Sequence, residues 1–136
     1  VKNKSVILID DSLVRGTTCH KIVKMLYEAG AKEVHVRIAC PEIKYPDFYG
    51  VDMPTKEELL AHKKNNIEMC DYIKAKSLKF LSLNGLYQAL AGEKRNSNYP
   101  QFSDHYFTGD YPVKPRDNLQ GFNVRQLSLL SGKSNN

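Results

Sequence analysis

The chain opens on a short apolar run that stops at two acids. Residues 5–9 read Ser-Val-Ile-Leu-Ile, and Asp10 and Asp11 follow directly. An unbroken apolar run with β-branched side chains is typical of a strand buried on both faces, as in a parallel sheet. We therefore predict a buried strand at 5–9, followed by a short loop at 12–16.

A helical period begins where this loop ends. One face of the helix predicted at 17–29 carries the apolar side chains Cys19, Ile22, Val23, Leu26 and Ala29. Gly30 follows as a C-terminal cap, because glycine accepts positive φ without strain. Residues 33–39 then alternate in polarity ahead of Pro41, which predicts a second strand. Strand, helix and strand form one βαβ unit, for which a right-handed crossover is expected.

Shorter elements follow. Residues 40–54 hold three prolines among aromatic side chains and predict an ordered loop. Thr55 and Glu58 form a capping-box pattern ahead of a short helix. A third strand is predicted at 78–81, between helices at 66–73 and 83–91, the latter capped by Ser82. The expected inward positions are Ile67, Cys70 and Ile73 in the first helix and Leu86 and Leu90 in the second.

The remaining chain predicts a tail that packs on the domain. Beyond Gly92 it is rich in Asn, Ser, Pro and Gly, punctuated by Tyr99, Phe102, Tyr106, Phe107, Tyr111 and Phe122. We predict that 1–92 form the main domain, that 93–130 dock on it through these aromatic side chains, and that 131–136 are frayed. The predicted fold is α/β, a parallel sheet with flanking helices followed by a largely irregular C-terminal tail. Because about three strands are fewer than a typical sheet holds, we expect the C-terminal part of a longer protein, whose other strands lie upstream or in another chain.

Composition narrows the class of protein. The 136 residues are 41% hydrophobic and 26% charged, which suits one modest globular domain. The net charge of +5 is spread along the chain, so we expect a solvated surface and no nucleic-acid partner. No apolar run is as long as a membrane span, and no secretory leader pattern opens the chain. With three widely spaced cysteines, we expect reduced thiols, a cytoplasmic location and no membrane partner.

The candidate chemistry lies between residues 10 and 18. Ligands of α/β sheets bind beyond the carboxyl ends of the strands, and a helix N-terminus there offers unpaired N–H groups to a phosphate. Gly16 allows close backbone approach, and Thr17 and Thr18 add hydroxyl donors. Asp10 and Asp11 suit the hydroxyl groups of a sugar and a hydrated Mg²⁺. Together these features predict a site for a phosphorylated ribose.

A simpler interpretation stays open: Asp10 and Asp11 end a strand and Thr17 caps a helix, with no ligand involved. Each feature alone favours it, but the joint pattern of apolar strand, two acids and Gly-Thr-Thr favours ribose phosphate. The sequence has neither G-x-x-x-x-G-K-[ST] nor G-x-G-x-x-G, so a P-loop or a dinucleotide fold is unsupported.

A resemblance to a known family rests on these residues. The run 9–18, Ile-Asp-Asp-Ser-Leu-Val-Arg-Gly-Thr-Thr, resembles the phosphoribosyl-pyrophosphate signature of type I phosphoribosyltransferases, in the variant of the amidophosphoribosyltransferases. The segments 41–43, 45–46, 48–54, 57–61 and 107–112 extend the resemblance to about residues 1–115. It implies a partial type I phosphoribosyltransferase fold.

The resemblance also implies an activity. Amidophosphoribosyltransferases catalyse the first committed step of purine synthesis. In this reaction, ammonia released from glutamine displaces pyrophosphate from C1 of phosphoribosyl pyrophosphate. The family's glutaminase half, with its N-terminal cysteine nucleophile, has no match here, so we expect no glutamine-dependent activity from this chain alone. The family generally forms oligomers, which implies a homo-oligomer for the whole enzyme.

The substrate-binding residues that the resemblance implies are Asp10, Asp11, Ser12, Val14, Arg15, Gly16, Thr17 and Thr18. Asp10 and Asp11 would hold the ribose 2′- and 3′-hydroxyls beside Mg²⁺, and the backbone of 14–18 would cradle the 5′-phosphate. Arg15 either contacts phosphate or pyrophosphate or is an exposed loop charge, and the sequence leaves both open. No catalytic residue is assigned within this chain.

Some family members ligate an iron–sulfur cluster. The positions that match its ligands here are Asp47, Ser103 and Tyr106, none of them a thiolate, so we expect no cluster. Cys19 lies in the first helical turn, where a thiol pKa can fall, but its place on the apolar face favours core packing. Two other functions stay open, a regulatory module of the same fold that senses phosphoribosyl pyrophosphate and a salvage base phosphoribosyltransferase.

Overall fold

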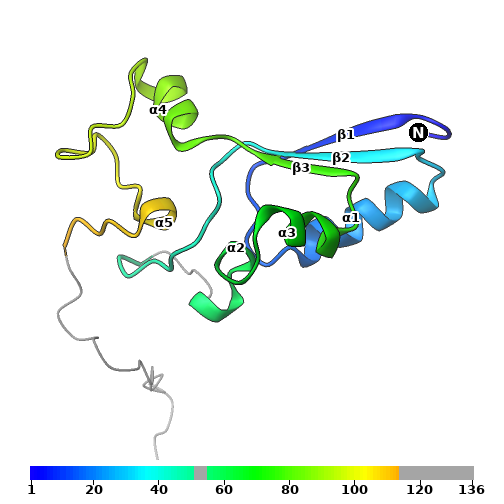
Figure 1. Ribbon diagram of the computed structural model, residues 1–136, viewed down its shortest axis with the longest axis horizontal. Helices are drawn as coiled ribbons and strands as arrows, with labels where there is room; N and C mark the ends of the chain where they lie inside the picture. Colours follow the sequence, from blue (N-terminus) through cyan, green and yellow to red (C-terminus); the bar gives the residue numbers. More distant parts are fainter. Residues whose placement is uncertain (51–54, 114–136) are drawn as a thin grey trace, which may run out of the picture.

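Among residues 1–50 and 55–113, which the computed structural model describes, three parallel strands form one sheet (Figure 1). The strands are β1 (Ser5–Asp10), β2 (Glu33–Ile38) and β3 (Ser77–Phe80), in the order β1-β2-β3. Helices α1 (Thr17–Glu28) and α3 (Asn66–Ile73) lie against one face of this sheet. The predicted parallel sheet with flanking helices is confirmed.

The face of the sheet toward α1 and α3 carries the core. The register places Val6 beside Val34 and Leu8 beside Val36, so that alternate side chains of neighbouring strands share this face. Val34 and Val36 are fully buried. The buried side chains that the two helices add are Cys19, Val23, Met69 and Ile73.

The opposite face of the sheet is open among the described residues. The prediction that 5–9 is buried on both faces is therefore wrong, since Ile7 is 64% exposed and Ile9 is 73% exposed. These side chains alternate with Val6 and Leu8, and α1 and α3 cover only the face of the latter pair. An unbroken apolar run marks a strand, but it does not show which of its faces a helix of the same chain covers.

Helix α1 begins at the predicted residue and ends at Glu28, one residue earlier than predicted, with Ala29 as its C-cap and Gly30 in the left-handed conformation just beyond. Cys19 and Val23 of the predicted apolar face are buried. Ala29 is exposed because the helix has already ended there. The βαβ unit of β1, α1 and β2 is thus formed as the hydrophobic pattern indicates.

Two short elements precede α3. A 3₁₀ turn (Lys56–Glu58) and α2 (Leu60–Lys63) occupy the segment that the capping-box pattern marks. Helix α3 has the predicted bounds, and its apolar face differs from the prediction in one residue. Ile67 is exposed and Met69 is buried, because Met69 and Ile73, four residues apart, share the face toward the sheet.

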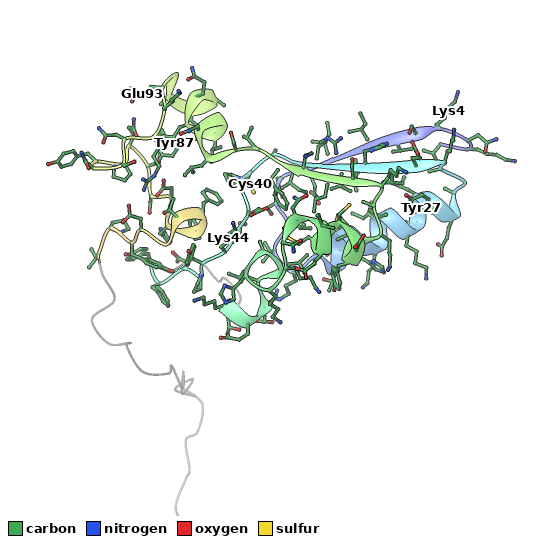
Figure 2. All side chains as sticks on the ribbon, in the orientation of Figure 1. Lys4, Tyr27, Cys40, Lys44, Tyr87 and Glu93 are labelled. Carbon is green, nitrogen blue, oxygen red and sulfur yellow. The ribbon has the colours of Figure 1, made fainter. Side chains whose placement is uncertain are left out.

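Helix α4 (Leu83–Ala91) packs on the tail rather than on the sheet. It begins as predicted at Ser82, whose hydroxyl accepts the Gly85 N–H at 3.0 Å. The prediction that Leu90 points inward is wrong, since this side chain is 64% exposed. The buried residue of α4 is Tyr87 (Figure 2), whose hydroxyl donates to Oδ2 of Asp104 at 2.9 Å.

The tail contains a short helix, α5 (His105–Thr108), and contacts the loop that follows β2. The backbone N–H groups of Lys44 and Tyr45 donate to the carbonyl of Tyr106 at 2.9 and 3.1 Å. The Tyr111 hydroxyl donates to the same loop at 2.8 Å. Tyr99 is exposed, so this aromatic side chain does not dock as predicted.

Some predictions fall outside the described residues, namely the end of the 48–54 motif, the docking of Phe122 and the frayed end at 131–136. Within the described part of the chain, every helix is too short or too polar to cross a membrane.

Candidate functional site

The loop that joins β1 to α1 lines a pocket of about 320 Å³ at the carboxyl end of the sheet. Residues 10–19 line it, so the structure brings all eight predicted substrate-binding residues together. The loop leaves the sheet at Asp10, whose carbonyl accepts the Ala39 N–H at 2.9 Å. The pocket therefore sits where ligands of parallel sheets bind.

One wall of the pocket is the N-terminus of α1. Gly16 occupies the N-cap position with φ 77° and ψ −8°, and no side chain caps the first turn. That turn also contains no acidic residue, while Thr17 and Thr18 are exposed. Uncapped N–H groups and the partial positive charge of the helix end favour an anion at this point.

The other wall carries the two carboxylates. The Asp11 N–H donates to Oδ1 of Asp10 at 3.1 Å, and the Ser12 hydroxyl donates to Oδ1 of Asp11 at 3.0 Å. Asp10 is half-buried and Asp11 is exposed, so oxygens of both can face solvent or a ligand. Among the described residues, no group of three or more His, Cys, Asp or Glu side chains is placed to hold a metal ion by itself.

Two cysteines border the carboxylates without being activated by them. Burial, followed by the negative charge of Asp10, raises the pKa of Cys19 to about 11. Burial and the charge of Asp11 raise the pKa of Cys40, which lies where the chain leaves β2 (Figure 2), to about 11. Both thiols therefore stay protonated near neutral pH, as expected for Cys19 as a core residue.

A larger hollow of about 480 Å³ lies beyond β2 and β3, bordered by Lys44, Lys79 and Phe107. Two helix N-termini border it and both are capped, that of α4 by the hydroxyl of Ser82 and that of α3 by the side chain of Asn65. An anion would have to displace one of these caps, whereas the N-terminus at Gly16 is open. The β1–α1 loop is therefore the stronger candidate for binding an anion.

Comparison with known proteins identifies homologues of this chain. No protein-family model matches the sequence. The amidophosphoribosyltransferase of Rhizobium etli is 54% identical over 132 residues, which cover 96% of this chain and 27% of that protein. A solved structure, glutamine phosphoribosylpyrophosphate amidotransferase from B. subtilis complexed with ADP and GMP, matches with a TM-score of 0.74 and 46% identity, covering 82% of this chain and 24% of that one. This chain is homologous to a C-terminal part of the amidophosphoribosyltransferases.

The predicted resemblance to amidophosphoribosyltransferases is thus confirmed. A further relative, the amidophosphoribosyltransferase of Staphylococcus aureus, is 49% identical over 113 residues, or 83% of this chain and 23% of that protein. The chain spans about a quarter of the length of the curated relatives it matches.

His105 lies among the three residues at the positions where some amidophosphoribosyltransferases ligate an iron–sulfur cluster. Its Nε2 donates to Oδ1 of Asp47 at 2.7 Å, and its Nδ1 lies 3.0 Å from the hydroxyl of Ser103. Burial, with the charge of Asp47 next, raises the pKa of Tyr106. The structure thus joins Asp47, Ser103 and Tyr106 in a polar network, and the absence of a cluster stays a prediction.

Sequence reasoning missed three residues that contact the loop from behind. Glu58 pairs with Arg15 at 3.2 Å, and Leu60 and Tyr72 lie against Gly16. Glu58 is recognisable from the sequence as a capping residue, but nothing in the sequence connects it to a loop 43 positions earlier. These contacts depend on how α2 and α3 pack, which local patterns do not specify.

Proposed function

We propose that this chain supplies the ribose 5-phosphate and Mg²⁺ site of an amidophosphoribosyltransferase. The observation that carries the proposal is the pocket at residues 10–19, where two carboxylates face an uncapped helix N-terminus. Ribose 5-phosphate can place its phosphate at the helix N-terminus and its hydroxyl groups at the carboxylates, whereas either wall alone fits many ligands. Homology to amidophosphoribosyltransferases at 46–54% identity supports this assignment over a merely structural turn.

Each residue has a defined task in this proposal. The backbone N–H groups of 14–18 and the hydroxyls of Thr17 and Thr18 bind the 5′-phosphate, because they surround the positive end of α1. Asp10 and Asp11 accept hydrogen bonds from the 2′- and 3′-hydroxyls, since ionised carboxylates are acceptors only. Together they orient the ribose so that its C1 faces out of the loop, toward the attacking amine and the leaving group.

Asp10 and Asp11 are also the residues that would hold Mg²⁺. The fit rests on the donor set, because two adjacent carboxylates offer hard oxygen ligands, and Mg²⁺ commonly takes one or two of these and completes its shell with water and substrate oxygens. When bound, the metal supplies positive charge that stabilises the departing pyrophosphate. A site that shares its metal with the substrate needs no third protein ligand.

The whole reaction lies beyond a chain of this length. In the complete enzyme we propose that phosphoribosyl pyrophosphate is the substrate, that the ammonia comes from a glutaminase domain, and that the enzyme is a cytoplasmic homo-oligomer. The expected product is 5-phosphoribosylamine, formed in the first step of purine synthesis. This chain contributes binding and orientation, and no side chain in it is assigned to proton transfer.

The proposal is tested by titrating ¹⁵N-labelled chain with ribose 5-phosphate, with and without Mg²⁺, in heteronuclear NMR spectra, which detect even millimolar affinity. We expect the amide signals of 10–18 to shift. The double variant D10N/D11N removes the carboxylates and should lose the Mg²⁺-dependent part of the response. Asp71→Asn, an exposed aspartate on α3 outside the pocket, is the matched control and should respond like the wild type. If the loop signals do not move in the folded wild-type chain, the proposed function is wrong.

A further inference from the structure

A backbone hydrogen bond joins the candidate anion-binding loop, residues 12–16, to the start of α2. The Leu60 N–H donates to the carbonyl of Val14 at 2.9 Å. This bond engages the Val14 carbonyl with the first residue of α2. The conformation of the loop thus depends on where the start of α2 lies.

Two side chains form a wall behind Gly16. An ideal Cβ on Gly16 would lie 2.7 Å from Cδ2 of Leu60 and 3.0 Å from Cε1 of Tyr72. Leu60 is only 5% exposed and belongs to the main core, so this wall cannot retreat freely. The close approach leaves no room for a side chain at Gly16, which has the left-handed conformation at the start of α1.

A further contact joins the first turn of α1 to α3. Nδ1 of His20 donates to the carbonyl of Tyr72 at 3.0 Å, and the His20 N–H makes the first backbone bond of α1 to the Gly16 carbonyl at 2.9 Å. Tyr72 is therefore tied to the same turn whose N–H groups face the pocket. The side chain behind Gly16 and the helix that begins there are held as one unit.

Nε of Arg15 contacts the segment on this same side. Its Nε donates to Oε1 of Glu58 at 3.2 Å, while Oε2 of Glu58 accepts the Thr55 N–H at 3.2 Å. The hydrogen bond from Arg15 and then that from the Thr55 backbone lower the pKa of Glu58, so the carboxylate is ionised at neutral pH. Arg15 is thereby engaged with the segment behind the loop.

We propose that Leu60 and the Arg15–Glu58 pair are positioning residues that set the shape of the phosphate-binding loop. Arg15 acts through Glu58 and binds the ligand only with its backbone N–H. This inference rests on the proposed function, because it assigns the residues that hold the same site in shape. It answers the question that the sequence left open about Arg15.

A core substitution tests the wall. Leu60→Ala removes the side chain behind Gly16, and we expect ribose 5-phosphate affinity to fall about tenfold, since small displacements of a binding loop are costly. Leu78→Ala is the matched control: Leu78 is equally buried in the same core but lies on β3, outside the pocket. It should destabilise the chain comparably and leave the affinity of the folded protein unchanged. Equal affinity losses in both variants would mean that Leu60 matters only for folding.

A charge exchange tests Arg15 without touching the core. Arg15→Glu and Glu58→Arg should each weaken ribose 5-phosphate binding by about two- to five-fold, the range expected for an exposed ion pair. The double variant R15E/E58R restores the pair in reverse and should recover most of the affinity. If the Arg15 side chain binds phosphate directly, the reversed pair cannot recover it, because position 15 then carries a negative charge.

The two proposals fail in different ways. No loop response in the wild-type chain overturns the proposed function. The positioning roles alone are overturned by two other outcomes, each with a normal wild-type response. In one, R15E/E58R does not recover the affinity that the single variants lose. In the other, Leu60→Ala and Leu78→Ala lose equal affinity.

Discussion

Nε2 of His105 donates a hydrogen bond to Oδ1 of Asp47 over 2.7 Å, and both side chains are buried. The two residues lie 58 positions apart, so this bond joins the tail to the loop after β2. The hydroxyl of Ser103 occupies the other ring nitrogen. His105 therefore has a partner on each side and fixes where the tail lies on the domain.

Asp47→Ala should release this attachment. Removing the acceptor of a buried hydrogen bond leaves the Nε2–H group of His105 without its partner, and we expect a loss of about 1–3 kcal/mol in the free energy of unfolding. Urea unfolding at neutral pH measures the loss. Asp71→Ala, on the exposed surface of α3, should change the same quantity by less than about 0.5 kcal/mol. Two variants of equal stability would show that the Asp47–His105 contact contributes nothing to the fold.

A second buried carboxylate makes the stability of the tail depend on pH. Burial alone would raise the pKa of Asp104, but the hydrogen bonds from Arg95 and Tyr87 outweigh it and hold the pKa below its ordinary value. A carboxyl whose pKa is lower in the folded state stabilises the fold above its unfolded pKa, and this contribution is lost as pH falls through the folded pKa.

The unfolding free energies of wild type and Asp104→Asn should therefore differ by a constant amount above about pH 5, and the difference should shrink below about pH 4. Urea unfolding at a series of pH values measures it. A difference that grows as the pH falls would mean that the pKa of Asp104 is raised in the folded protein.

The sequence predicts the βαβ unit and its loop because the decisive signals there are local. The apolar run at 5–9, the helical period after residue 17 and Gly30 each depend on neighbours within a few residues. The eight pocket residues are also consecutive or nearly so, so that predicting the loop brings them together. Element positions follow from such patterns almost to the residue, as the bounds of α3 and α4 illustrate.

The pairings across the chain could not be predicted in the same way. Leu90 is apolar and in phase with Leu86, but α4 turns Tyr87 toward Asp104, 17 residues later, and leaves Leu90 exposed. The pairing of Arg15 with Glu58 likewise depends on the packing of α2 against the loop. The periodicity of apolar residues in a single sequence predicts where a helix lies, but it does not predict which surface the helix packs against.

Cys19 and Cys40 should resist alkylation in the folded protein. With a pKa of about 11, Cys19 and Cys40 are about one part in a thousand thiolate at pH 8, and the thiolate is the reacting species. Burial also raises the pKa of Cys70. Cys40 and Cys70 are only half-buried whereas Cys19 is buried, so we expect Cys19 to react last. Peptide mass spectrometry after timed iodoacetamide treatment gives the order, with urea-unfolded chain as the control. Rapid labelling of Cys19 in the folded chain would contradict its place in the core.

Gly16→Ala should damage the loop in two separable ways. A side chain in the left-handed region costs about 1–2 kcal/mol, and the new Cβ would also meet Leu60 at 2.7 Å, where overpacking adds about 1–3 kcal/mol. Gly92→Ala is the matched control, because Gly92 has φ +71° and a Cβ added there would meet nothing within 4 Å. We expect Gly92→Ala to show the conformational cost alone and Gly16→Ala to lose about 2 kcal/mol more in urea unfolding. The Gly16 variant should also lose its NMR response to ribose 5-phosphate while Gly92→Ala keeps it, since only the former displaces the turn that faces the pocket. Equal losses in the two variants would show that the wall behind Gly16 yields to a methyl group and does not hold the loop in shape.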